Sequence, residues 1–224
     1  FMPPQGLLLI AAYMPEGWPV RFIDENIRKA TAAELEWADV ILVSGMHVQR
    51  QQINDIAERA HAAGKVVMLG GPSASASPEM YPDIDYLHIG EMGDATDRLI
   101  ACLDESVARP SAQVRFETKD RLPLQDFPIP AYDLIPLKNY LMLTLQFSSG
   151  CPYLCEFCDI RILPDNNRPH NFSASHIVSE LDHLARLDDR HPVLRLALAL
   201  AHAGFQRLTA DGLVREDADE QPTL

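Results

Sequence analysis

Three of the four cysteines lie within eight residues of one another, at Cys151, Cys155 and Cys158. This C-x3-C-x2-C spacing places three thiolates on one short loop. Thiolates are preferred ligands of iron–sulfur clusters, and three of them can hold three irons while the fourth iron stays open to a small molecule. The spacing therefore predicts a cluster with one open, reactive iron.

Other cysteine chemistries fit this pattern less well. A structural zinc site needs four protein ligands, usually in two pairs, and no second pair follows. A disulfide framework is disfavoured because no secretory signal is visible and three closely spaced cysteines would give strained pairings. The fourth cysteine, Cys102, lies in a helical pattern over residues 95–107, where a lone cysteine more often packs than binds metal.

The run Cys151-Pro-Tyr-Leu-Cys155-Glu-Phe-Cys158 resembles the cluster loop of the radical S-adenosylmethionine enzymes. The resemblance implies that the three cysteines bind a 4Fe-4S cluster and that Phe157 lies beside the nucleoside of S-adenosyl-L-methionine. It also implies that the open iron is chelated by S-adenosylmethionine, whose reductive cleavage gives a 5′-deoxyadenosyl radical. The protein would supply position and a dry pocket.

Before the cysteine loop, short apolar runs alternate with amphipathic helical patterns. This alternation predicts an α/β fold with a parallel sheet covered on both faces. The predicted helices are residues 7–13, 31–37, 51–63 and 94–103, and the predicted strands are residues 20–24, 40–43, 65–69 and 86–89.

Three turns follow predicted strands, and ligands of parallel sheets bind beyond the carboxyl ends of the strands. The turns are Ser44-Gly45-Met46, Gly70-Gly71-Pro72 and Gly90-Glu91. Taken singly, a glycine after a strand usually only permits a tight turn. Together, a serine turn followed by a Gly-Gly turn resembles the cobalamin-binding domain, in which these loops approach the corrin and its nucleotide tail. Glycine would permit close backbone approach there.

The flanking segments 21–26, 37–46 and 65–72 look like the amino-terminal half of cobalamin-dependent radical S-adenosylmethionine proteins, and the likeness covers most of residues 4–160. It implies a Rossmann-like sheet that binds cobalamin. The family's first strand would precede Phe1, and with it a loop that in some members carries a cobalt-ligating histidine. Neither His47 nor His61 replaces that histidine, so the lower cobalt ligand stays open.

The resemblance also suggests how the chain is divided. Proline is dense over the middle of the chain, which predicts a stiff connector leading into a first barrel strand at residues 141–147 and a helix at residues 173–187. The predicted parts are a cobalamin-binding-like domain (4–107), a connector (108–140), the start of a radical S-adenosylmethionine partial (β/α) barrel (141–187) and an atypical tail (188–224). The atypical tail predicts a fragment or a truncated protein.

Charge and hydropathy limit the partners. Nineteen Lys and Arg residues stand against 32 Asp and Glu residues, and the net charge of -13 repels a phosphate backbone, so nucleic acid is not expected as a partner. No apolar run reaches the length of a membrane span. We expect a cytoplasmic protein with a small-molecule or lipid-like substrate and a reductant such as flavodoxin or ferredoxin.

Two functions are consistent with these observations. The first is a cobalamin-dependent radical S-adenosylmethionine enzyme that methylates or rearranges an unactivated carbon. The alternative is a cobalamin-binding module, or a truncated remnant without turnover.

Overall fold

The computed structural model describes residues 2–153, 155–156 and 169–187. The chain divides into two compact units, residues 1–171 and residues 172–224. The first unit contains a parallel sheet and the cysteine loop as far as it is described. The described part of the second unit contains helix α6 (Ala174–Leu187), which confirms the helix predicted there.

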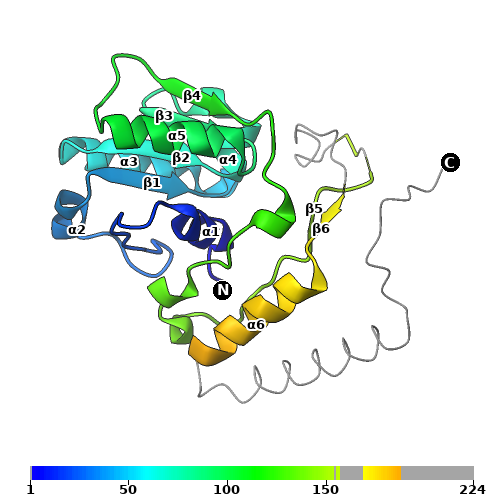
Figure 1. Cartoon of the computed structure of the whole chain (residues 1–224). Helices are drawn as coiled ribbons and strands as arrows, with labels where there is room; N and C mark the ends of the chain where they lie inside the picture. Colours follow the sequence, from blue (N-terminus) through cyan, green and yellow to red (C-terminus); the bar gives the residue numbers. More distant parts are fainter. Residues whose placement is uncertain (1, 154, 157–168, 188–224) are drawn as a thin grey trace, which may run out of the picture. The chain divides into compact units, whose positions relative to one another are not determined.

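A four-stranded sheet forms the centre of the first unit (Figure 1). All neighbouring strands are parallel, and their order along the sheet equals their order in the sequence. The strands are β1 (Val40–Ser44), β2 (Val66–Gly70), β3 (Tyr86–Ile89) and β4 (Val114–Glu117). Because parallel strands share a direction, their carboxyl ends meet at one edge of the sheet.

Alternate side chains of the strands enter two different cores, as the two-residue period of a strand requires. Val67 and Leu69 of β2 pack in the core formed with helices α3 (Arg50–Ala62) and α4 (Pro72–Ala76). Val66 and Met68 pack in the core formed with helix α5 (Asp94–Glu105). All five residues of β2 are buried. The predicted sheet, covered on both faces, is therefore confirmed.

The remaining helices of the first unit are short. Helix α1 (Gln5–Tyr13) buries Leu8, and helix α2 (Ala32–Trp37) begins at a capping box in which Thr31 and Glu34 each satisfy the other's backbone N–H. The 3₁₀ turns are η1 (His47–Gln49), η2 (Pro78–Met80), η3 (Leu124–Asp126), η4 (Tyr132–Leu134) and η5 (Leu137–Asn139).

The strand predicted over residues 20–24 is wrong, because this segment is irregular in the structure. A cavity of about 890 Å³ is lined both by residues 18–26 and by the whole of β1. Within the described residues β1 pairs with β2 alone, so the segment has no ladder partner in β1. Apolar composition alone cannot hold an extended segment in a sheet.

The proline-rich stretch contains a strand that was not predicted. Residues 114–117 form β4 and pair along their whole length with β3, from Tyr86↔Val114 to Ile89↔Glu117. Phe116 is buried beneath α5, and its ring lies 6.2 Å from that of Tyr86. The strand is short and its alternate residues are exposed, so its sequence signal is weak.

The barrel strand predicted over residues 141–147 is also wrong. These residues are irregular, and Leu141, Met142 and Phe147 are exposed. A two-residue strand β5 (Ser148–Ser149) follows and pairs antiparallel with β6 (His170–Asn171). The described part of the chain offers residues 141–147 no neighbouring strand, which explains why they form none.

The predictions for the tail and for membrane spans have different outcomes. The Ala/Leu run and the acidic stretch of residues 188–224 lie outside the described residues. Within the described residues, no helix has the length and hydropathy of a membrane-spanning segment. The predicted domain boundaries stay predictions.

Candidate functional site at the carboxyl edge of the sheet

The turns after β1 and β2 are in direct contact. Ser44 and Gly70 are register partners at the ends of these strands, so both turns start at the same level. The backbone N–H of Ser73 donates to the carbonyl oxygen of Gly45 at 3.3 Å and joins the two turns. The first two predicted binding turns therefore form one surface.

Gly71 makes that contact possible. Its φ of 85° lies in the left-handed region, and a Cβ atom at this position would overlap the Ser44 hydroxyl. Both the dihedral angle and the space exclude other residue types. The Gly-Gly turn thus packs its backbone directly against Ser44, which is a close approach that only glycine permits.

The turn after β3 joins the same edge. Gly90 has a φ of 97°, and its N–H donates to the Ser75 hydroxyl of α4 at 2.9 Å. A Cβ atom on Gly90 would lie 3.0 Å from the Cβ atom of Thr118. The three turns are therefore connected through α4. Their residues lie together at the carboxyl edge of the sheet.

The segment after Ser44 presents apolar side chains to solvent at this edge. The side chains of Met46 and Val48 are 56% and 92% exposed. Between them, His47 is exposed, and its Nδ1 lies 3.2 Å from the Ser73 hydroxyl, which also bonds Tyr81. Exposed apolar side chains therefore stand beside the glycine turns at this edge.

The 890 Å³ cavity runs along β1 and reaches this edge. Met46 and Pro72 line it near the carboxyl ends of the strands, and Val107 lines it beyond the end of α5. Ile10 and Met14 of α1 contribute apolar walls. A cavity of this volume is in the range that small-molecule ligands occupy.

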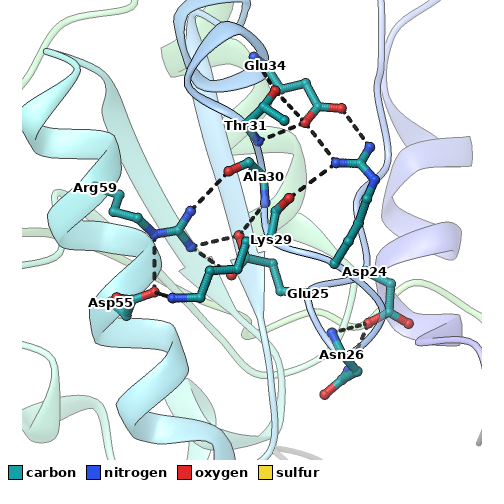
Figure 2. Close-up of polar contacts among 10 residues, drawn as sticks. Asp24, Glu25, Asn26, Lys29, Ala30, Thr31, Glu34, Asp55 and Arg59 are labelled. Atoms are coloured by element: carbon teal, nitrogen blue, oxygen red, sulfur yellow. Dashed lines mark hydrogen bonds and ion pairs between the residues drawn. The ribbon is translucent and has the colours of Figure 1, made fainter.

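A network of charged residues fixes the irregular segment that faces β1 across the cavity (Figure 2). Arg59 of α3 binds both carboxylate oxygens of Glu25, at 2.7 and 2.6 Å, and its Nε lies 3.1 Å from Asp55. Lys29 adds a more exposed contact to Asp55 at 2.9 Å. These contacts tie the segment to α3 without any strand pairing.

Polar contacts around Asp24 also hold this segment. Asp24 accepts hydrogen bonds from the backbone and side chain of Asn26, and Asn26 in turn accepts one from Gln49 in the β1 turn. The hydroxyl of Tyr140 donates to Asp24 at 3.2 Å, and burial raises the pKa of this hydroxyl, which keeps it protonated as a donor. The cavity wall is therefore anchored on both sides.

His88 is a buried titratable group in β3, close to the candidate site. Its Nε2 lies 2.9 Å from the Thr96 hydroxyl, and burial lowers its pKa. A Cβ atom added to Gly70 would lie 3.5 Å from the Cβ atom of His88. His88 therefore packs as a neutral ring beneath the Gly-Gly turn.

The cysteine loop is described only in part. Cys151 is half-buried and follows Gly150, whose φ is 87°, while Cys155 is exposed. Phe157 and Cys158 lie outside the described residues. Within the residues that are described, no three His, Cys, Asp or Glu side chains are close enough to hold a metal ion. Cys102 packs on the apolar face of α5, in agreement with its predicted role.

One contact joins the cysteine loop to the sheet edge. The hydroxyl of Ser149 in β5 donates to Glu91 Oε1 at 2.5 Å, and Glu91 also forms an ion pair with Arg121. Ser149 and Arg121 were not among the predicted site residues. Neither belongs to a recognisable motif, so only the folded chain reveals their contact with Glu91.

Comparison with known proteins was made once this geometry was established. Residues 1–100 match the family model of the B12 binding domain. The match includes the turns after β1, β2 and β3, and the parallel sheet is consistent with a Rossmann-like domain of that kind. The predicted cobalamin-binding domain is confirmed at this level.

The chain is also similar to several methyltransferases. It is 59% identical over 184 residues to a hopanoid C-2 methylase of Rhodopseudomonas palustris, covering 82% of this chain and 35% of that protein. It is 36% identical over 194 residues to an uncharacterized methyltransferase of Synechocystis, covering 86% of this chain and 35% of the relative. A bacteriochlorophyllide d C-12(1)-methyltransferase of Chlorobaculum tepidum is 23% identical over 165 residues, covering 69% of this chain and 34% of the relative.

The chain thus spans about a third of the length of these relatives. No solved structure matches it significantly. The similarity to methyltransferases over most of the chain agrees with one of the two predicted reaction outcomes, the transfer of a methyl group.

Proposed function

We propose that this chain forms the cofactor-binding portion of a cobalamin-dependent radical S-adenosylmethionine methyltransferase with a lipid-like substrate. The observation that carries the proposal is the placement of the cysteine loop directly after β5, which is hydrogen-bonded to the sheet edge of the B12 binding domain. The hopanoid C-2 methylase at 59% identity supports a lipid-like substrate.

The residues at the sheet edge fit cobalamin. Gly71 and Gly90 let the turns pack closely against Ser44 and Thr118, which brings the turn residues together at one edge. Met46 and Pro72 of these turns line the 890 Å³ cavity, which can accept a bulky substituent of the corrin. In this proposal the residues that approach cobalamin are those of the first two turns together with Gly90, and the aromatic ring of Phe157 approaches S-adenosylmethionine. The first two turns comprise Ser44, Gly45, Met46, Gly70, Gly71 and Pro72.

Cys151, Cys155 and Cys158 supply the thiolates that would hold a 4Fe-4S cluster. Once bound, the cluster supplies single electrons and cobalamin supplies a transferable methyl group. The chain's own contribution would be positional: the thiolates would fix the cluster, the turns at the sheet edge would hold cobalamin, and the apolar residues around Met46 would exclude water from that contact. A one-electron donor such as flavodoxin or ferredoxin would reduce the cluster.

Anaerobic reconstitution with iron and sulfide tests the cluster. The wild-type chain should become brown and should cleave S-adenosylmethionine to 5′-deoxyadenosine under reduction. Substitution of Cys151, Cys155 or Cys158 by Ala should abolish the colour, whereas Cys102→Ala should not. A colourless wild-type product would contradict the proposal.

A second candidate function is a cobalamin-binding module without turnover. The observation that favours it is the irregular conformation of residues 141–147, where a barrel strand was predicted. Hydroxocobalamin titration combined with the cleavage assay separates the two functions. Binding without 5′-deoxyadenosine formation would support the module, and both together would support the enzyme.

A further inference from the structure

Glu91 connects two parts of the proposed site that are distant in sequence. It directly follows Gly90 at the carboxyl edge of the sheet, and its Oε1 accepts the 2.5 Å hydrogen bond from Ser149. A single residue, Gly150, separates Ser149 from Cys151. A single side chain therefore spans from the proposed cobalamin edge to the start of the cysteine loop.

The Glu91 side chain is held in place from several directions. Its other carboxylate oxygen pairs with Arg121, whose side chain is only 8% exposed. Its backbone oxygen accepts a 2.6 Å hydrogen bond from the Thr118 hydroxyl. Both carboxylate oxygens are thus engaged by protein groups, and the carboxylate is positioned to orient Ser149 rather than to contact a ligand itself.

The strand that Glu91 anchors is weak without it. Strand β5 has two residues, and within the described residues it pairs with the two residues of β6 alone. So short a ladder is marginal by itself. Hydrogen bonds to an ionised carboxylate are stronger than those between neutral groups. The bond from buried Ser149 to Glu91 therefore provides a charge-assisted polar tie between β5 and the sheet edge.

We propose that Glu91 is a positioning residue that sets the place of the cysteine loop against the carboxyl edge of the sheet. The inference rests on the proposed function and assigns Glu91 a role different from the direct cofactor contact that its sequence position predicts. It acts through Ser149, on the loop that begins at Gly150.

Cysteine alkylation in the cluster-free full-length chain tests this tie. Iodoacetamide labelling followed by mass spectrometry should show Cys151 reacting roughly tenfold faster in Glu91→Gln and Ser149→Ala, because β5 separates from the edge more often. Ser149→Thr retains the hydroxyl and should restore the wild-type rate. Matched controls are Glu117→Gln and Ser148→Ala, whose exposed side chains should leave the rate unchanged.

Spectroscopy of the reconstituted cluster tests whether the bond between Glu91 and Ser149 affects the proposed 4Fe-4S site. After reconstitution, Glu91→Gln and Ser149→Ala should alter the electron paramagnetic resonance spectrum of the reduced cluster with S-adenosylmethionine, while Ser149→Thr and both controls should not. If the wild-type chain takes up no iron, the proposed function fails, yet the alkylation comparison still decides whether Glu91 holds the loop.

Two results would overturn the inference. In the first, Cys151 reacts at the wild-type rate in both Glu91→Gln and Ser149→Ala. In the second, half-buried Cys102 on α5 accelerates as much as Cys151, which would show that the substitutions loosen the whole unit rather than release the cysteine loop.

Discussion

At the scale of single residues, Gly71 shows how backbone conformation and close contact act together. Its positive φ alone would strain any other residue, and its position against the Ser44 hydroxyl would add a clash. Gly64, after α3, has a φ of 72° but open space around it. A substitution at Gly64 would therefore carry the free-energy cost of the dihedral angle alone, whereas one at Gly71 would carry that cost and the cost of the clash with Ser44.

Gly71→Ala should lower the free energy of unfolding by about 3 kcal/mol, whereas Gly64→Ala should lower it by only about 1 kcal/mol. Urea-induced unfolding followed by circular dichroism measures both. Combining Gly71→Ala with Ser44→Ala should recover part of the loss, because the hydroxyl causes the clash. Equal losses for the two single variants would show that the contact with Ser44 costs nothing.

His88 gives the fold a pH dependence with a definite sign. Burial lowers its pKa in the folded chain, while the unfolded chain keeps the ordinary value near 6.5. As pH falls below about 6.5, the unfolded state binds the proton first, so stability decreases by at most about 1.4 kcal/mol per pH unit for this group. Above about pH 6.5, His88 is neutral in both states and no longer reduces the stability of the fold.

Unfolding measured between pH 7.5 and pH 5.5 checks this sign. The wild-type chain should lose stability over this interval, and His88→Gln should lose clearly less. If His88→Gln kept the full pH dependence, buried His88 would not be its source.

At the scale of elements, the segment opposite β1 depends on charged contacts instead of strand pairing. The side chains of Arg59 and Glu25 are 25% and 14% exposed, whereas that of Lys29 is 68% exposed. A partly buried pair leaves an uncompensated charge when one partner is removed, and an exposed pair does not. The two cations of the network should therefore differ in their importance.

Arg59→Met should reduce the free energy of unfolding by about 2 kcal/mol and speed hydrogen exchange in residues 19–34. Lys29→Met should change stability by less than about 0.5 kcal/mol and leave exchange in that segment unchanged. Urea unfolding and exchange mass spectrometry measure the two effects. Equal effects of the two substitutions would contradict the assigned difference in burial.

The elements that the sequence predicted correctly are those whose own periodicity determines them. Strands β1 to β3 and helices α3 and α5 carry strong apolar patterns, and they form at nearly the expected positions. Residues 20–24 and 141–147 carry similar apolar patterns but have no ladder partner, so no local signal could distinguish them from strands. Strand β4 shows the opposite case, because pairing with β3 makes a strand from a weak pattern.

At the scale of the whole molecule, the candidate site was predicted in its parts but not in its connections. Glycine and serine turns after strands are readable in one sequence because parallel strands end at one edge. The bond between Glu91 and Ser149 joins residues 58 positions apart, and nothing in either local pattern indicates it. The position of the cysteine loop on the sheet edge therefore required the structure.

The central claim is that cobalamin binds at the carboxyl edge of the sheet, and equilibrium dialysis with hydroxocobalamin tests it most directly. The wild-type chain should bind one equivalent, and Met46→Glu or Val48→Glu should weaken binding by about tenfold or more, because each places a charge against the apolar corrin. Leu187→Glu, at an exposed apolar position in the other unit, should bind as the wild type does. Absence of binding by the wild-type chain, or equal weakening by Leu187→Glu, would contradict the account.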